Sequence, residues 1–335
     1  MSVNPKHLVI AGATGAVGKE FLKVLEKIDY PLKSLRLLSS KRSAGTKIKF
    51  RGEMLQAEEM TKKSFSGCDL ALFSAGSAVT KEYANHVNDA GAVLVDNSSA
   101  FRMDKDVPLV IPEVNPDDVK SHKGIIANPN CSTIIMLMAV FPLYRKYPIR
   151  RLVISTYQAA SGAGQAAMDE LENGARSVLK GEDFIPKILP YRAAFNVFSH
   201  NSKIDESGYN EEERKLVYET RKILHDTNIL VTATCVRVPV LRAHSEAINI
   251  EFKVSAPDEA EARNLLGSFP GIRVIDDREK NYFPMPVEAS EKFECLVGRI
   301  RKDISQPDKG LELFVSGDQL LKGAALNAVQ IAQLI

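Results

Sequence analysis

The sequence predicts a two-domain α/β protein, with a doubly wound parallel sheet first and an α+β domain after it. Three observations lead to this fold class. Short apolar runs alternate with helical or polar stretches before residue 130, a glycine-rich turn follows the first run, and longer strand-like runs come after residue 131. The length of 335 residues also favours two domains, at roughly 150 residues each.

The first domain is expected to be of the Rossmann type, because its apolar runs are short and separated as parallel strands are. The runs expected to form strands are residues 7–11, 35–38, 70–73, 92–95, 110–111 and 125–127. A helix is predicted over residues 16–28, where apolar residues recur at helical spacing. These residues are Val17, Phe21, Val24, Leu25 and Ile28.

The second domain shows longer elements and no internal repeat. Helices are predicted over residues 131–147, 164–180 and 210–225, and a further helix over residues 317–335 belongs to the first domain. Strands are predicted over residues 152–157, 229–239 and 247–254, and we expect a mostly antiparallel sheet. The expected division of the chain is residues 1–130 plus 317–335 for the first domain and residues 131–316 for the second.

The charge balance argues against a nucleic-acid or membrane-surface protein. Lys and Arg number 44 and Asp and Glu number 42, which gives a net charge of +2. The longest apolar run, Ile134 to Phe141, is far shorter than the roughly 20 residues of a membrane span. Glycines interrupt the first apolar stretch at once, so no signal peptide is expected.

The cysteines indicate neither a disulfide framework nor a metal site. There are four in a long chain, they form no CxxC pair, and they are Cys68, Cys131, Cys235 and Cys295. A reducing cytoplasm is therefore the expected location, and no metal is expected.

The glycine turn has the spacing GxxGxxG and lies between the first predicted strand and helix. Glycines allow a sharp turn and close approach to a pyrophosphate, whose charge is favoured by a helix N-terminus. The cofactor contacts predicted here are Gly12, Thr14, Gly15, Ala16 and Val17. The alternative is a glycine turn that only packs the helix on the sheet.

The loop after the second predicted strand indicates which dinucleotide is bound. It reads Ser39-Ser-Lys-Arg-Ser43 and holds no acid for a ribose hydroxyl. A 2′-phosphate calls for arginine and polar donors, so the loop favours NADP over NAD. The predicted contacts are Ser40, Arg42 and Ser43, and the alternative is a solvated basic loop.

Cys131 is placed to be a nucleophile. It follows Asn128-Pro-Asn130 at the start of a long apolar helix, where unpaired N–H groups and the helix dipole stabilise a thiolate. A thiolate can attack an aldehyde carbon. Among six histidines, only His244 directly follows a predicted strand and turn, so it is the candidate base, although a structural role is the alternative.

Taken together, these segments resemble the aspartate-semialdehyde dehydrogenases, in particular the bacterial form. The similarity runs in order through nearly the whole chain. Its motifs are GATGAVG (12–18), NSSAFR (97–102), NPNCST (128–133), QAASGAG (158–164), ExxK (212–215), RVPVxRxH (237–244) and KGAA (322–325).

The resemblance implies a reversible reaction in which L-aspartate 4-semialdehyde, phosphate and NADP⁺ give L-4-aspartyl phosphate and NADPH. The reductive direction would serve lysine, methionine and threonine biosynthesis. By this resemblance Cys131 forms a thiohemiacetal and then an acyl-thioester, His244 is the acid/base, and Gln158 orients the substrate.

The resemblance also implies ligands for the substrate, phosphate and cofactor. Arg237 would bind the substrate carboxylate and Glu212 its ammonium group. The implied phosphate ligands are Arg102, Lys215 and Asn130, and the implied nicotinamide-side contacts are Ser161, Gly162 and Gln319. Guanidinium and ammonium groups suit these anions, although an isolated ExxK pair is usually a surface salt bridge.

Two other functions remain as alternatives. An N-acetyl-glutamyl-phosphate reductase would use the same fold plan, a cysteine and NADP, but its acylated amine gives Glu212 no ammonium to bind. A catalytically silent paralogue would usually lack the cysteine or the histidine, and both are present. The resemblance implies a homodimer built on the second domain's sheet.

Overall fold

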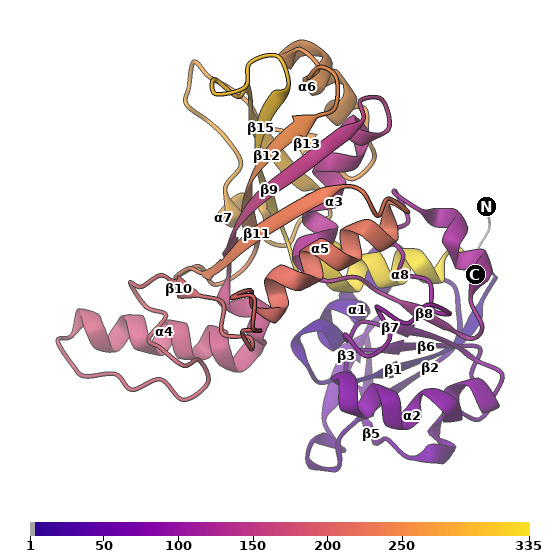
Figure 1. Cartoon of the computed structure of the whole chain (residues 1–335). Coiled ribbons are helices and arrows are strands. Elements are labelled where there is room, and N and C mark those ends of the chain that lie inside the picture. Colours follow the sequence, from indigo (N-terminus) through magenta and orange to yellow (C-terminus); the bar gives the residue numbers. More distant parts are fainter. Residues whose placement is uncertain (1–3) are drawn as a thin grey trace. The chain divides into compact units, whose positions relative to one another are not determined.

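The computed structural model describes residues 4–335, which form two compact units (Figure 1). The first comprises the residues up to Asn130 together with Ala324–Ile335, and the second comprises Cys131–Gly323. The α/β class predicted above is confirmed. The chain returns to the first unit at Ala324 and not at the expected residue 317, because residues 310–317 form a strand of the second unit's sheet.

The first unit contains a six-stranded parallel sheet with the doubly wound order. Its strands in spatial order are β5 (Glu58–Glu59), β2 (Leu32–Ser39), β1 (Lys6–Ala11), β6 (Leu70–Phe73), β7 (Val93–Asp96) and β8 (Ile125–Ala127). Figure 1 shows α2 (Ser77–Asp89) on one face and α1 (Ala16–Lys27) with α8 (Leu326–Ala332) on the other. A small hairpin, β3 (Lys47–Phe50) and β4 (Glu53–Gln56), completes the strands of this unit.

One strand predicted for this unit is wrong, and one predicted helix starts later than expected. Residues 110–111 form no strand, since only an isolated bridge joins Leu109 to Ala127. Prolines at 108 and 112 flank this run and lack the N–H that a strand ladder uses. The helix predicted from residue 317 starts later, as a π-helical turn (Leu321–Ala325) followed by α8.

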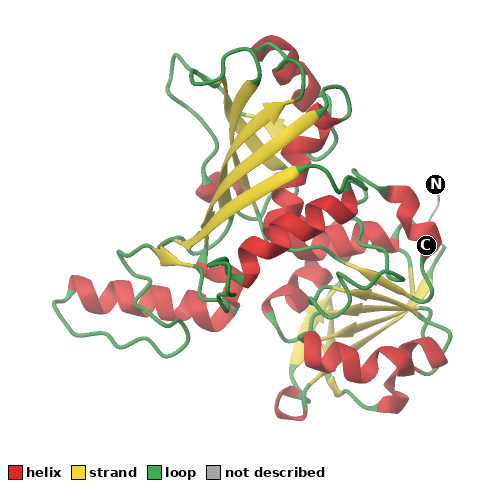
Figure 2. Cartoon of the chain, viewed as in Figure 1, coloured by secondary structure: helices red, strands yellow, loops and turns green. Residues whose placement is uncertain are grey.

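The second unit is built on a seven-stranded, mostly antiparallel sheet (Figure 2). Its strands in spatial order are β10 (Phe198–Ser199), β11 (Leu230–Arg237), β9 (Ile149–Gln158), β12 (His244–Phe252), β15 (Gly310–Gly317), β14 (Cys295–Lys302) and β13 (Ile272–Val274). Its helices are α3 (Cys131–Tyr144), α4 (Gln165–Leu179), α5 (Glu211–Ile223), α6 (Glu259–Gly267) and α7 (Pro286–Ala289). Helices α3, α5 and α6 pack on the strands, and side chains on that face are buried.

Within residues 4–335, no helix combines the length and the apolar character needed to cross a membrane.

Helix α3 has no polar face, because it lies inside the second unit. From Ser132 to Val140 every residue is buried, and the helix contacts β12, β14, β15, α5 and α6. Burying an apolar side chain such as Ile134 or Leu137 stabilises a fold by roughly 1.5–3 kcal/mol. This packing fixes the direction of α3 and therefore the position of Cys131 at its first residue.

Glu246 is an acidic side chain inside this sheet. It is fully buried on β12, between its cross-strand neighbours Thr156 on β9 and Val315 on β15. Neither of its carboxyl oxygens has a hydrogen-bond partner among the described residues. Burial, and then the charge of Glu212, raise the pKa of Glu246 well above its ordinary value, so the group is neutral when the protein is folded.

Glu246→Gln should therefore stabilise the protein increasingly as the pH rises. The unfolded chain ionises Glu246 above about pH 4.5, so folding must then return a proton to it. This costs about 1.4 kcal/mol for each pH unit until the folded group itself ionises. Urea unfolding at several pH values should show a gain near pH 8 that disappears toward pH 4.5. A gain in the free energy of unfolding that does not depend on pH would contradict a neutral Glu246. The control is Glu53→Gln, at an exposed site on β4.

Gly18 allows α1 to pack closely on the turn that follows β1. A Cβ at this position would lie 2.1 Å from the carbonyl oxygen of Gly12 and 2.7 Å from the Cα of Ala13. Both atoms belong to the backbone, so neither can move away without deforming the turn. The third glycine of the motif is thus required by packing, independently of any ligand.

We expect Gly18→Ala to lower the free energy of unfolding by about 1–3 kcal/mol, the usual cost of overpacking. Gly267→Ala is the matched control, because a Cβ there meets only the Cγ2 of Val274, at 3.9 Å. Urea unfolding of the two variants compares them directly. Equal stability of the two would show that the turn yields without cost.

Candidate active site

The glycine turn of the first unit lies at the carboxyl end of β1. The N–H groups of Gly12 and Ala13 donate to the carbonyl of Leu38 at 2.9 and 3.0 Å, which joins the turn to the end of β2. Gly12 has a φ of +82°, which favours glycine. Gly15 precedes α1 and offers no side-chain cap, so the first N–H groups of α1 remain available to an anion. Thr14, Ala16 and Val17 lie in this turn and the first helical turn.

The basic loop predicted to choose the dinucleotide follows β2 directly. Residues Lys41–Ser43 form a short 3-10 turn that begins after Ser40, and Lys41 and Arg42 are exposed. Because β1 and β2 are parallel neighbours, this loop and the glycine turn leave the same edge of the sheet side by side. Arg42, Ser40 and Ser43 therefore lie beside the glycine turn at this edge of the sheet.

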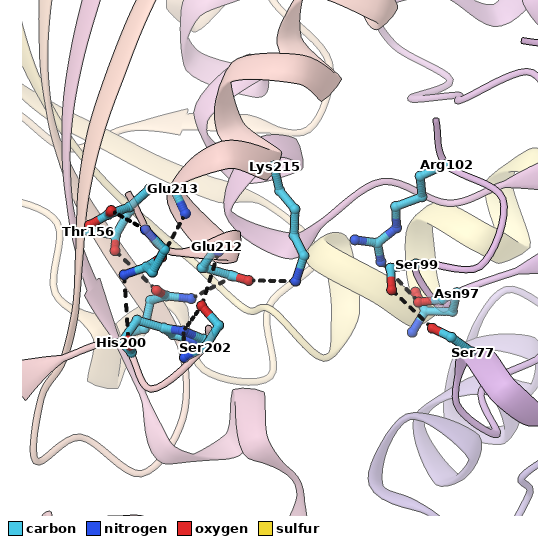
Figure 3. A network of polar contacts seen from close by, with 12 residues as sticks. Ser77, Asn97, Ser99, Arg102, Thr156, His200, Ser202, Glu212, Glu213 and Lys215 are labelled. Carbon is cyan, nitrogen blue, oxygen red and sulfur yellow. Dashed lines mark hydrogen bonds and ion pairs between the residues drawn. The ribbon is translucent and has the colours of Figure 1, made fainter. Parts of the chain in front are cut away.

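Arg102 is held by main-chain carbonyls at the same carboxyl edge. Its Nε donates to Asn128 at 2.9 Å and its Nη2 to Asn97 at 3.0 Å. The buried carboxylate of Asp96 fixes this loop by accepting from the N–H and hydroxyl of Ser98 at 2.9 and 2.8 Å. Figure 3 shows Arg102 beside Asn97. Asn130, also buried, is the last residue of this unit before α3.

Cys131 is the first residue of α3, as the sequence predicted. Its side chain is half-buried, whereas Cys68, Cys235 and Cys295 are buried. A Cβ at Gly323 would lie 2.9 Å from the Cβ of Cys131, so the chain passes close to the thiol here. A thiolate at Cys131 would raise the pKa of Arg237, which means that the two opposite charges stabilise each other. The helix terminus and this arginine therefore both stabilise a sulfur anion.

His244 is the first residue of β12 and is fully buried. The N–H of Ala159 donates to its Nδ1 at 3.1 Å, so the neutral ring carries its proton on Nε2. Burial, followed by the charge of Arg237, lowers the pKa of His244 to about 3. This Nε2 is buried and has no hydrogen-bond partner among the described residues, and a Cβ at Gly162 would lie 3.1 Å from it.

Gln158, Glu212 and Lys215 form one hydrogen-bonded group. Gln158, at the end of β9, donates from Nε2 to Glu212 Oε1 at 3.1 Å, and Lys215 donates from Nζ to Glu212 Oε2 at 2.9 Å. Asn210 and Glu213 form a capping box at the start of α5, which fixes Glu212 in the first turn. Figure 3 shows the contact between Glu212 and Lys215 as a dashed line.

Arg237 ends β11, and its guanidinium is almost completely buried. Its Nη1 donates to the carbonyl of Ala159 at 3.3 Å, and its Nη2 contacts His200 Nε2 at 2.9 Å. Its Nε has no hydrogen-bond partner among the described residues. Burial lowers the pKa of Arg237, yet the group remains a cation at neutral pH.

Gln319 is hydrogen-bonded to Ser161 and to Ala243, the residue before His244. Its Oε1 accepts from the N–H of Ala243 at 3.0 Å, and its Nε2 donates to the hydroxyl of Ser161. A Cβ at Gly323 would lie 3.3 Å from the Cβ of Gln319, so Gln319 is also close to the Cys131 segment.

The second unit thus brings together nine of the residues that the sequence singled out. They are Cys131, Gln158, Ser161, Gly162, Glu212, Lys215, Arg237, His244 and Gln319. Sequence reasoning missed Thr156, whose hydroxyl donates to Gln158 Oε1 at 3.2 Å, and His200. His200 lies in an irregular polar tract, and only the pairing of β10 with β11 places it.

Nowhere in residues 4–335 do three or more His, Cys, Asp or Glu side chains gather as metal ligands would.

Comparison with known proteins covers both units. A family model described as "Semialdehyde dehydrogenase, NAD binding domain" matches residues 7–122, and one described as "Semialdehyde dehydrogenase, dimerisation domain" matches residues 140–322. An aspartate-semialdehyde dehydrogenase of Synechocystis is 53% identical to the chain, over 99% of this chain and 98% of its own length.

Solved structures are similar over the same extent. Aspartate semialdehyde dehydrogenase II of Vibrio cholerae, solved in complex with ASA, superposes with a TM-score of 0.95 at 40% identity, covering 99% of this chain and 98% of its own. The Candida albicans aspartate semialdehyde dehydrogenase, solved with NADP, has a TM-score of 0.75 at 25% identity, with 99% and 98% covered. With both units matched and more than half of the residues identical to a relative, the chain belongs to the aspartate-semialdehyde dehydrogenase family.

Proposed function

We propose that this protein catalyses the reversible, NADP-dependent and phosphorylating oxidation of L-aspartate 4-semialdehyde to L-4-aspartyl phosphate. The observation that carries the proposal is the arrangement of the second unit. There a half-buried cysteine begins a helix, in the same unit as a buried neutral histidine, a buried arginine and a buried glutamate. In cells the reductive direction would supply precursors of lysine, methionine and threonine.

Cys131 is proposed as the nucleophile. Its thiolate adds to the aldehyde carbon, and the C=O π electrons move onto oxygen to give the anion of a thiohemiacetal. The Nε2–H of His244 is positioned as a hydrogen-bond donor and acid toward that oxygen, because Ala159 occupies its Nδ1. NADP⁺, when bound, accepts the hydride. Loss of hydride from the thiohemiacetal carbon restores the C=O bond and leaves an acyl-thioester on Cys131.

Phosphate completes the proposed cycle. A phosphate oxygen attacks the thioester carbon, the C–S bond breaks, and Cys131 leaves as a thiolate while the phosphate proton passes to solvent. Lys215, Arg102 and Asn130 are the proposed phosphate ligands. Gln158 is proposed to hold the carbonyl group of the intermediate in place, because its amide is itself fixed by Thr156 and Glu212.

Substrate recognition is assigned to Arg237 and Glu212. The cation suits the α-carboxylate and the carboxylate suits the α-ammonium group, so the pair accepts an unmodified amino acid. An N-acetylated substrate has no ammonium group for Glu212 to bind, which argues against N-acetyl-glutamyl-phosphate reductase. Both Cys131 and His244 are present, which argues against a silent paralogue.

The cofactor contacts are divided between two groups of residues. Gly12, Thr14, Gly15, Ala16 and Val17 are proposed to bind the pyrophosphate, and Ser40, Arg42 and Ser43 the 2′-phosphate. Ser161, Gly162 and Gln319 are proposed to contact the nicotinamide half. The lack of an acidic residue between Ser39 and Ser43 supports NADP over NAD.

We also propose a cytoplasmic homodimer. None of the four cysteines is in a disulfide, as expected of a reducing compartment. The match to a dimerisation domain covers the second unit's sheet, where β9 exposes Tyr157 and β11 exposes Leu230. Two such faces, packed together, would remove these side chains from water.

Cys131→Ala should abolish NADPH formation from L-aspartate 4-semialdehyde while NADP binding, measured by calorimetry, is unchanged. Turnover in the unaltered protein should require phosphate, so the assay is run with and without it. Cys68→Ala, which removes a buried thiol of the first unit, should keep turnover. Activity of the Cys131 variant near that of the unaltered protein would eliminate the covalent route.

Arg42→Ala should weaken NADP binding by about 10–100-fold and NAD binding little, because a charge-assisted contact to phosphate contributes about 1.5–3 kcal/mol. Calorimetric titration with each dinucleotide measures this. Lys123→Ala is the control, since Lys123 precedes β8 at the opposite edge of the sheet and pairs with Asp106. Equal losses for NADP and NAD in the Arg42 variant would refute recognition of the 2′-phosphate by this loop.

A further inference from the structure

His200 is placed against Arg237 by the shortest strand of the second sheet. Strand β10 pairs antiparallel with the end of β11, Phe198 opposite Arg237 and Ser199 opposite Val236. The N–H of His200 then donates to the carbonyl of Cys235 at 2.8 Å. Three successive backbone positions therefore fix where the imidazole lies, next to the guanidinium.

The contact between the two side chains determines the tautomer of His200. Arginine has only donors, so the 2.9 Å contact requires Nε2 of His200 to accept from Nη2 of Arg237. The proton of the neutral ring is then on Nδ1, which donates to the hydroxyl oxygen of Ser202 at 3.1 Å. The Ser202 N–H also approaches Nδ1, at 3.3 Å, but with this tautomer that contact is not a hydrogen bond.

Ser202 continues the connection to Glu212. Its hydroxyl oxygen accepts from the N–H of Glu212 at 3.1 Å, in the first turn of α5. A chain of three hydrogen bonds thus runs from Arg237 through His200 and Ser202 to Glu212. Figure 3 shows His200, Ser202 and Glu212 in this order.

His200 is neutral near pH 7, because its pKa is lowered. Burial lowers the pKa of His200 to about 4, and the cations Arg237 and Lys215 act in the same direction against the opposing charge of Glu212. A protonated ring would present a donor and a positive charge to the guanidinium. Only the neutral ring of His200 can accept a hydrogen bond from Arg237.

We propose that His200 is a positioning residue that holds the Arg237 guanidinium at a fixed distance from Glu212. The carbonyl of Ala159 fixes Nη1 and His200 fixes Nη2, so the plane of the guanidinium is set and the unpartnered Nε is left for a ligand. This inference rests on the proposed function, in which Arg237 and Glu212 bind the carboxylate and ammonium of one α-amino acid group. His200 thereby contributes to selection of amino-acid aldehydes over aldehydes that lack either charge.

Steady-state kinetics of two His200 variants test the inference. His200→Leu removes the acceptor and should raise KM for L-aspartate 4-semialdehyde about tenfold, with kcat within about twofold and NADP affinity unchanged. His200→Gln can accept through Oε1 and should restore KM to within about threefold of the unaltered value. His86→Leu, a half-buried histidine on α2 of the first unit, should change neither constant. If the glutamine fails to rescue KM, or if kcat falls with KM unchanged, the inference is overturned.

A double-mutant cycle separates this inference from the proposed function. Arg237→Leu removes the donor and should raise KM by itself, and His200→Leu should add nothing further in that background. Additive losses would mean that His200 acts independently of Arg237, which overturns the inference alone. An unchanged KM in Arg237→Leu would instead refute the assignment of Arg237 in the proposed function.

Nuclear magnetic resonance gives a readout independent of activity. Imidazole ¹⁵N shifts of the unaltered protein should show His200 with its proton on Nδ1, and Arg237→Leu should change that pattern. A proton on Nε2 would contradict the geometry, whatever the kinetics show. Should His200→Leu fail to fold, Ser202→Ala interrupts the same hydrogen-bond chain and should also raise KM, while an unchanged KM would count against the inference.

Discussion

The burial of the Arg237 charge is the constraint on which the second unit depends. Removing a guanidinium from water costs several kcal/mol unless fixed partners replace its hydration. Here the carbonyl of Ala159 and the ring of His200 do so, with the negative charge of Glu212 nearby. Because each partner is attached to a different element, the end of β9, the tract after β10 and the start of α5 all have to be correctly placed before the charge is stabilised.

Backbone groups in the same region decide the state of His244. An N–H at Ala159 donates to one ring nitrogen, and burial next to Arg237 keeps the ring uncharged. The carbonyl of Ala159 fixes the arginine, so a single peptide segment after β9 sets both groups. The chemistry proposed for Cys131 therefore depends on Ala159, which acts through its backbone N–H and carbonyl and has no reactive side chain.

Sequence periodicity predicted most of the architecture, since short apolar runs and helical spacing report burial directly. The position of Cys131 was also predictable, because Pro129 before an apolar run marks the start of a helix. Val110 and Ile111 misled because an apolar pair between prolines resembles a strand. His200 could not be found, because its role depends on a two-residue strand pairing that no local pattern encodes.

The two ends of the first unit are separated in the chain by the whole second unit. Asn327 donates to the side chain of Asn128 at 2.7 Å and to the carbonyl of Val110 at 2.9 Å, and Tyr30 donates to the carbonyl of Ala332 at 3.1 Å. During synthesis, residues 324–335 emerge from the ribosome after everything else described above. The first unit therefore cannot complete these hydrogen bonds until the whole second unit has been synthesised.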